Sequence, residues 1–291
     1  MGVSENFSTF CRNLRMSQDT VDNISYRAKR ITKQINKDFW KSSSDTDHSF
    51  YAGSYGRGTD IHVSDIDLLI RLPYSTYQRY NNYYGNGQSA LLQEVKNSIE
   101  KTFRSHKRAD GQVVQVSFKD GVSYEIVPCF VNDDNSYTYP DTNNSGSWKV
   151  TNPKAEIKEM TRLNNQANKN LKRLCRMMRA WKSKWEVPIS GFLIDTLAYQ
   201  FMKKWPYSDK SYLYYDFMVR DFLFFLSQQD STQLYWSAPG SGQRVYRKGI
   251  FEHKARKCYN LALEAIEMES KGYEYTTKQK WREIFGNKYP L

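Results

Sequence analysis

Hydrophobic residues recur with two different periods along the first half of the chain. Between residues 17 and 40 they return every three or four positions, which predicts a long amphipathic helix with Ser17 as its N-cap, and residues 89–104 have the same period. In residues 65–70, by contrast, Ile66, Leu68 and Ile70 alternate with Asp65, Asp67 and Leu69, and residues 113–130 contain two β-rich runs joined by a turn. The first half is therefore expected to be mixed α/β.

The second half has a different pattern. A stretch rich in Gly, Asn and Ser at residues 136–153 separates it from the first half and predicts a boundary near residue 150. We therefore expect two domains, residues 1–150 with the long N-terminal helix and residues 151–291, which are helical. The helical segments expected after the boundary are 154–184, 190–204, 212–228, 249–270 and 276–285.

Composition and charge limit the partners and the location. The 291 residues include 43 Lys and Arg against 31 Asp and Glu, a formal charge of +12, so polyanions are the expected partners. Neither a signal peptide nor a membrane-spanning apolar run is recognisable, so we expect a cytoplasmic protein without a membrane partner. The four cysteines are widely spaced and are expected to be reduced thiols.

Two aspartates provide the first chemical signal. Asp65 and Asp67 are at positions i and i+2 of the predicted strand, so their carboxylates lie on the same face. Two close carboxylates favour Mg²⁺, which proteins commonly bind together with substrate phosphates. The preceding Gly53-Ser54 pair can bring backbone N–H groups and a hydroxyl to those phosphates, because glycine permits close approach. An isolated Asp-x-Asp is usually only a solvated strand face, but this combination favours a metal and phosphate site.

A third acid is expected nearby, since in-line transfer at phosphorus commonly uses two metal ions about 3.5 to 4 Å apart. The candidate is Glu125, in the second β-rich run. Its neighbours Tyr124 and Ile126 can pack on one side of that strand while Glu125 faces the other. An adjacent strand could thus deliver this carboxylate to the aspartate pair.

These residues carry a resemblance to a known family. YAGSYGRGTDIHVSDIDLLI at 51–70 and VSYEIVP at 122–128 resemble the catalytic signature of the polymerase-β-like nucleotidyltransferase superfamily. With SGSWKVTNP at 145–153, LKRLCRMMRAWK at 171–182 and PISGFLIDTLA at 188–198, the chain resembles the bacterial CD-NTases, the cGAS/DncV-like synthases of SMODS type. The resemblance implies an α+β fold, a palm of mixed sheet and helices followed by a C-terminal helical domain, with NTP bound in the cleft between them.

The resemblance also implies roles for the acidic and glycine-rich segments. Gly53 and Ser54 would hold the donor triphosphate, while Asp65, Asp67 and Glu125 would be catalytic and carry two Mg²⁺ ions, for which Mn²⁺ can substitute. Glu125 departs from the aspartate that is common at this position in the wider superfamily, and its extra methylene shifts its reach by about 1 Å.

Three residues of the second half complete the expected nucleotide site. Lys172 matches the position at which related synthases place a lysine on the triphosphate. Ser190 lies beside the position of a phosphate-binding serine, so either Ser190 shifts by one residue or the backbone N–H of Gly191 makes this contact. Phe192 falls where an aromatic ring can stack on a base. For Arg173, Lys182 and Lys184 of the same basic helix, a solvated face is the expected role.

By this resemblance the protein is expected to be a template-independent nucleotidyltransferase. It would join NTPs (ATP, GTP, UTP or CTP) through a linear intermediate into a cyclic di- or trinucleotide, releasing pyrophosphate. The product would act on a separate effector protein in antiphage signalling. The sequence leaves open the bases, the linkage and the ring size of this product.

Two alternatives share these motifs. The same chemistry serves nucleotidyltransferases that modify RNA, a protein or a small molecule, and the charge of +12 leaves room for non-specific contact with nucleic acid. The second alternative is a non-catalytic RNA-binding module with the same fold. All three acids are present, which argues against it.

Overall fold

In a computed structural model that describes residues 2–61, 65–103 and 106–291, the chain forms two compact units. The sheet unit ends at Lys154, close to the boundary expected near residue 150. Residues 1–15 and 57–62 group with the helices of the second half, which differs from the expected division. The sheet unit comprises Met16–Gly56 and Val63–Lys154, and the helical unit comprises Met1–Arg15, Arg57–His62 and Ala155–Leu291.

The sheet unit is built on a mixed sheet. Its strands within the described residues are β1 (Ser49–Tyr51), β2 (Asp65–Arg71), β3 (His106–Asp110), β4 (Val113–Ser117), β5 (Ser123–Val131), β6 (Tyr137–Asp141) and β7 (Ser147–Thr151). They follow the order β1-β2-β5-β4-β3, and β6 joins β5 to β7. The β2–β5 pair is parallel and its neighbours are antiparallel, which confirms the predicted α+β class.

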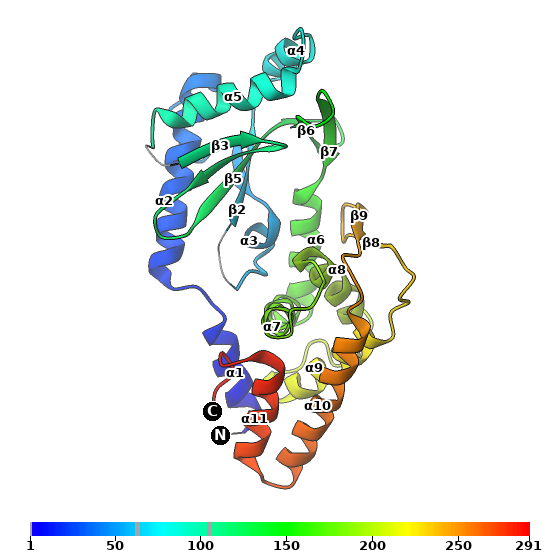
Figure 1. Cartoon of the computed structure of the whole chain (residues 1–291). Helices are drawn as coiled ribbons and strands as arrows, with labels where there is room; N and C mark the ends of the chain where they lie inside the picture. The colour runs from blue at the N-terminus through cyan, green and yellow to red at the C-terminus, as the bar shows by residue number, and fades with distance from the viewer. Residues whose placement is uncertain (1, 62–64, 104–105) are drawn as a thin grey trace. The chain divides into compact units, whose positions relative to one another are not determined.

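Helices cover one face of this sheet (Figure 1). They are α2 (Gln18–Ile35) and α5 (Gly87–Glu100), with α4 (Tyr74–Asn81) packed against α5, while the short α3 (Gly53–Arg57) precedes β2. The apolar stripe of α2 packs with α5 against the even-numbered residues of β2 and β5. Ser17 caps α2 as predicted, accepting a hydrogen bond from the backbone of Thr20 at 3.2 Å. The long helix expected to residue 40 ends in one π-helical turn, Asn36–Trp40.

The stretch at 136–153 is not a simple connector. It forms a β-hairpin, because β6 pairs with both β7 and the end of β5. The Gly and Asn residues that indicated a linker form the turn of this hairpin, where Asn144, Ser145 and Gly146 have positive φ. The sequence pattern identified the turn and missed the two short strands around it.

The helical unit contains the helices expected after residue 153. They are α6 (Pro153–Gln166), α7 (Asn170–Lys184), α8 (Gly191–Met202), α9 (Tyr215–Ser227), α10 (Glu252–Ser270) and α11 (Glu274–Phe285), with a 3-10 turn (Tyr212–Tyr214) and a small hairpin of β8 (Tyr235–Ser237) and β9 (Arg244–Tyr246). The predicted segment 154–184 is broken between α6 and α7, where Asn168 and Lys169 adopt positive φ. The small hairpin was not predicted.

An additional helix, α1 (Val3–Asn13), packs into the helical unit. Phe7 and Phe10 are fully buried there, and Phe7 meets the rings of Trp281 and Tyr289 edge to face at 5.1 and 5.4 Å. These long-range aromatic contacts explain why the first fifteen residues group with the C-terminal helices.

Two expectations from composition can be compared with the structure. All four cysteines are free and buried, as expected for reduced thiols. In the part of the chain that the structure describes, no helix combines the length and the apolar character needed to cross a bilayer.

Candidate nucleotide and metal site

The three predicted acids lie on neighbouring strands. Parallel pairing of β2 and β5 sets Asp67 opposite Glu125 and Asp65 opposite Ser123. Alternate residues of both strands, Ile66 among them, are buried on the helix-covered face, so the acids lie on the other face. This confirms that an adjacent strand carries Glu125 to the aspartate pair. Their role as metal ligands stays a prediction.

Ser123 supports one of these acids. Its hydroxyl donates a hydrogen bond to Oδ1 of Asp65 at 2.6 Å, which orients that carboxylate. The sequence reasoning did not assign a function to Ser123. A signal was present, because Ser123 is two residues before Glu125 and therefore shares its face of β5.

Gly53 makes the close approach that its residue type indicated. Its φ is +56°, in the left-handed region that favours glycine, and a β-carbon at this position would lie 1.7 Å from Oδ2 of Asp67. The preceding residue, Ala52, donates its backbone N–H to the carbonyl oxygen of Asp67 at 2.9 Å. The start of α3, which carries Ser54, is thus held directly against the second aspartate.

The acids repel one another electrostatically. Burial raises the pKa of the half-buried Glu125 carboxyl, and the negative charges of Asp67 and Asp65 raise it further. A cation at this face would relieve the repulsion, and carboxylate oxygens are the ligands that Mg²⁺ prefers, so the residues present fit the predicted metal. Among residues 2–61, 65–103 and 106–291, however, no three His, Cys, Asp or Glu side chains already converge in the arrangement of a metal site.

Lys172 lies in the first turn of α7, in the helical unit. Its ammonium group donates to Oγ1 of Thr161 at 3.1 Å. Burial lowers the pKa of Lys172, and the nearby guanidinium of Arg176 lowers it further. Gly58 also lies close to it, since a β-carbon there would lie 3.5 Å from the Lys172 Nζ. A half-buried cation beside another cation favours an anionic ligand.

Arg173 does not belong to a solvated face, contrary to expectation. Its guanidinium donates to the hydroxyl of Tyr215 at 3.1 Å and lies over the ring of Tyr212 at 4.8 Å. The basic pattern of α7 could not distinguish this packed arginine from a solvent-facing one, because the aromatic partners are some forty residues further along the chain.

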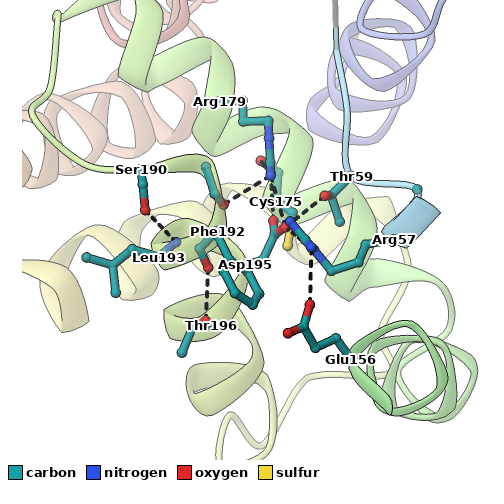
Figure 2. A network of polar contacts seen from close by, with 12 residues as sticks. Arg57, Thr59, Glu156, Cys175, Arg179, Ser190, Phe192, Leu193, Asp195 and Thr196 are labelled. Carbon is teal, nitrogen blue, oxygen red and sulfur yellow. Dashed lines mark hydrogen bonds and ion pairs between the residues drawn. The ribbon is translucent and has the colours of Figure 1, made fainter. Parts of the chain in front are cut away.

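Ser190 and Phe192 lie at the start of α8 (Figure 2). Ser190 is the N-cap, and its hydroxyl accepts a hydrogen bond from the backbone of Leu193 at 3.0 Å. The guanidinium of Arg57 lies 4.3 Å from the centre of the Phe192 ring. One face of this ring is therefore occupied, and a base could stack only on the other.

A buried ionic network lies beside these residues and was not predicted (Figure 2). Arg57 donates through Nε to Asp195 at 3.0 Å and is 3.4 Å from the carboxylate of Glu156. Arg179 donates two hydrogen bonds to Asp195, at 2.6 and 2.9 Å, and Thr59 donates a further one at 2.9 Å. The available signal was an acid at 195 inside an otherwise apolar helical segment.

The structure thus divides the predicted residues into two groups. The sheet unit contains five of them, Gly53, Ser54, Asp65, Asp67 and Glu125. The first four are close together in the sequence, whereas Glu125 is brought to them by strand pairing. The helical unit contains the other three, Lys172, Ser190 and Phe192.

Comparison with known proteins identifies a family that matches this chain. Residues 1–164, more than half of the chain, match the model of the Second Messenger Oligonucleotide or Dinucleotide Synthetase domain. A probable cyclic nucleotide synthase of Bacillus cereus is 23% identical over 275 residues, which cover 82% of this chain and 81% of the relative.

Solved structures show the same fold. The chain is similar to the CdnC protein of Escherichia coli in its complex with HORMA-deltaN, with a TM-score of 0.70, 14% identity and coverage of 99% of this chain and 98% of the other. It is also similar to the Vibrio cholerae cyclic AMP-GMP synthase DncV in complex with a linear intermediate, with a TM-score of 0.64, 12% identity and coverage of 99% and 87%. This confirms the polymerase-β-like fold that the motifs predicted.

Proposed function

Because the chain belongs to the second messenger oligonucleotide or dinucleotide synthetase family, and is thus a nucleotidyltransferase, we propose that it joins NTPs into a cyclic di- or trinucleotide with release of pyrophosphate. The observation that carries this proposal is the parallel pairing of β2 and β5. It sets Asp67 opposite Glu125 on the face where Gly53 lies against Asp67.

The acids of the sheet unit would hold Mg²⁺. Asp65, Asp67 and Glu125 supply hard oxygen ligands, and Ser123 keeps one of those carboxylates oriented. When bound, two Mg²⁺ ions would neutralise charge on the triphosphate and lower the pKa of an attacking ribose hydroxyl. The Gly53 turn brings backbone groups and the Ser54 hydroxyl close to the same carboxylates, where a triphosphate could be gripped.

The helical unit would contribute further contacts to the nucleotide. Lys172 offers a half-buried ammonium whose lowered pKa reflects burial and a neighbouring cation, so an anionic triphosphate would stabilise its charged form. Ser190 would place its capping hydroxyl near phosphate, and Phe192 would offer its uncovered ring face to a base.

The product would be a diffusible signal for a separate effector protein in antiphage defence. Support comes from the family description and from the relatives, one called a cyclic nucleotide synthase and another solved with a linear dinucleotide intermediate. A linear intermediate would turn in the site, so that its free hydroxyl attacks its own 5′-triphosphate and closes the ring. Each of the two transfers forms one phosphodiester and releases one pyrophosphate for a dinucleotide.

The test is incubation of the purified protein with each α-³²P-labelled NTP, singly and with the other three, in Mg²⁺ or Mn²⁺. Products are treated with phosphatase and resolved. We expect a small phosphatase-resistant product that disappears with EDTA and with Asp67→Asn, which keeps the side-chain volume and removes the charge. Asp133→Asn, on the exposed loop after β5, is the matched control and should retain the product.

Other outcomes identify the alternatives. Label that appears only when RNA, a protein or a small acceptor is added would replace cyclisation by transfer to that acceptor. Product formation by Asp67→Asn at the wild-type rate would contradict the metal assignment. No incorporation under any of these conditions would contradict the enzymatic proposal for the isolated chain.

A further inference from the structure

The buried network around Asp195 joins three helices. Asp195 of α8 is fully buried, and it accepts hydrogen bonds from Arg57 at the end of α3 and Arg179 of α7. Although burial alone would raise the pKa of Asp195, the two guanidinium groups lower it overall. The carboxylate is therefore charged and fully engaged, with Thr59 as a further donor (Figure 2).

The same network fixes the first turn of α8. Arg179 also donates to the carbonyl oxygen of Gly191 at 3.0 Å, between the N-cap Ser190 and Phe192. Arg57 covers one face of the Phe192 ring with its guanidinium. Arg179 thus restrains the backbone next to Ser190, and Arg57 restrains the ring of Phe192. These are the two residues at the start of α8 that would contact nucleotide.

A second set of contacts extends from the network to Lys172. Gly58, which follows Arg57, accepts a hydrogen bond from Nη2 of Arg176 at 2.7 Å and lies against the Lys172 side chain.

Stability alone is a weak reason for such an arrangement. Replacing buried ion pairs by apolar residues of similar volume is often neutral or stabilising, whereas charged hydrogen bonds with fixed geometry restrict the positions of the elements they join. Apart from the ion pair of Arg57 with Glu156 of α6, the contacts of this network reach α7 and the start of α8, which carry proposed nucleotide ligands. This distribution favours a role in positioning.

We propose that Arg57, Asp195 and Arg179 form a positioning network that holds α7 and the start of α8 in the geometry needed to bind NTP. The inference rests on the proposed function. Arg57 is its central residue, because its planar fork reaches Asp195 and Glu156 while its face covers Phe192. None of the three residues contacts substrate in this proposal.

The test compares Arg57→Lys with the same change at a partly buried arginine of the same unit. Lysine keeps the charge and loses both the fork and the planar face. Arg247 is the control, because it also lies in the helical unit, pairs with the carboxylate of Glu252 at 2.7 Å and covers the rings of Trp236 and Phe251. A milder variant, Thr59→Val, removes one hydrogen bond to Asp195 without removing an ion pair.

Three quantities are measured for each variant: the melting temperature, the rise in melting temperature produced by ATP, and kcat and KM for NTP. We expect Arg57→Lys to raise KM about tenfold and to reduce the ATP-induced rise, and Thr59→Val to raise KM about threefold. Arg247→Lys should lower the melting temperature by a similar amount and leave KM within about twofold.

If Arg57→Lys and Arg247→Lys lower the melting temperature equally and also have equal KM values, the positioning role is overturned. If Arg57→Lys does not fold, an unchanged KM in Thr59→Val would overturn it by itself. A wild-type protein that neither gains stability from ATP nor forms product would instead contradict the proposed function, so the two failures are distinguishable.

Discussion

The carboxylate of Asp67 lies where a side chain on residue 53 would have to be. A β-carbon at Gly53 would come within 1.7 Å of Asp67 Oδ2 and 2.6 Å of its Cγ, and the backbone at Gly53 has φ of +56°. The glycine therefore permits both the turn and the contact between the start of α3, proposed to bind phosphate, and an acid proposed to bind metal. A residue with a β-carbon could not keep this contact without displacing the Asp67 carboxylate.

We predict that Gly53→Ala reduces product formation by about a hundredfold, because the added methyl displaces either the loop or Asp67. Gly111→Ala is the control. It has a similar φ of +61° but nothing within 4 Å of the added carbon, so it shares the backbone strain without the collision. Initial rates and melting temperatures of both variants are compared. Equal activities would show that the contact with Asp67 does not matter.

Ser123→Ala is predicted to raise the Mg²⁺ concentration for half-maximal activity about tenfold, since it removes the 2.6 Å hydrogen bond that orients Asp65. The measurement is a titration of initial rate against Mg²⁺. Ser123→Thr keeps a hydroxyl at the same position and should restore most of the metal affinity. A titration curve for Ser123→Ala that coincides with the wild type would exclude this role.

Lys172→Met is predicted to raise KM for NTP about tenfold while leaving the melting temperature of the nucleotide-free protein equal or higher. The reason is that burial and Arg176 lower the pKa of Lys172, so removal of its charge relieves a cost in the empty protein. Lys182→Met, on the same helix, is the matched control because burial also lowers its pKa. The hypothesis fails if both variants have the same KM.

Asp216, in the first turn of α9, gives a prediction for pH. Burial raises the pKa of this carboxyl from 3.8 to about 6, although it accepts a hydrogen bond from the backbone of Phe217 at 2.8 Å. Below about pH 4 both folded and unfolded states are protonated. Stability is then lost as pH rises, because only the unfolded state ionises easily, and the full cost is present above pH 6.

Asp216→Asn should therefore stabilise the protein by about 1 to 3 kcal/mol at pH 8 and have little effect at pH 4. Denaturant unfolding of both proteins at the two pH values measures this. Asp209→Asn, at an exposed position in the same unit, should leave stability nearly unchanged at both. A gain for Asp216→Asn of the same size at pH 4 and pH 8 would mean that ionisation is not its cause.

Local patterns predicted much of the candidate site. The i, i+2 spacing placed Asp65 and Asp67 on one strand face, and the residue type of Gly53 indicated a close approach before any fold was known. Helical periodicity located α2, α5 and most helices of the second half, because burial of one face determines it within a few turns. Several helix ends and the short strands β1, β3 and β6 to β9 were missed, since few residues contribute to each of these patterns.

By itself, then, the sequence determined the strand that carries the aspartates, the glycine turn before it, the family motifs and the position of most helices. Only the tertiary structure decided that β5 pairs parallel to β2, with Glu125 opposite Asp67, and that Ser123 orients Asp65. It also decided that Arg57 pairs with Asp195, which is 138 residues away in the sequence. Periodicity and residue type reflect interactions between residues that are close in the sequence. Which distant residues become partners depends on how whole helices and strands pack.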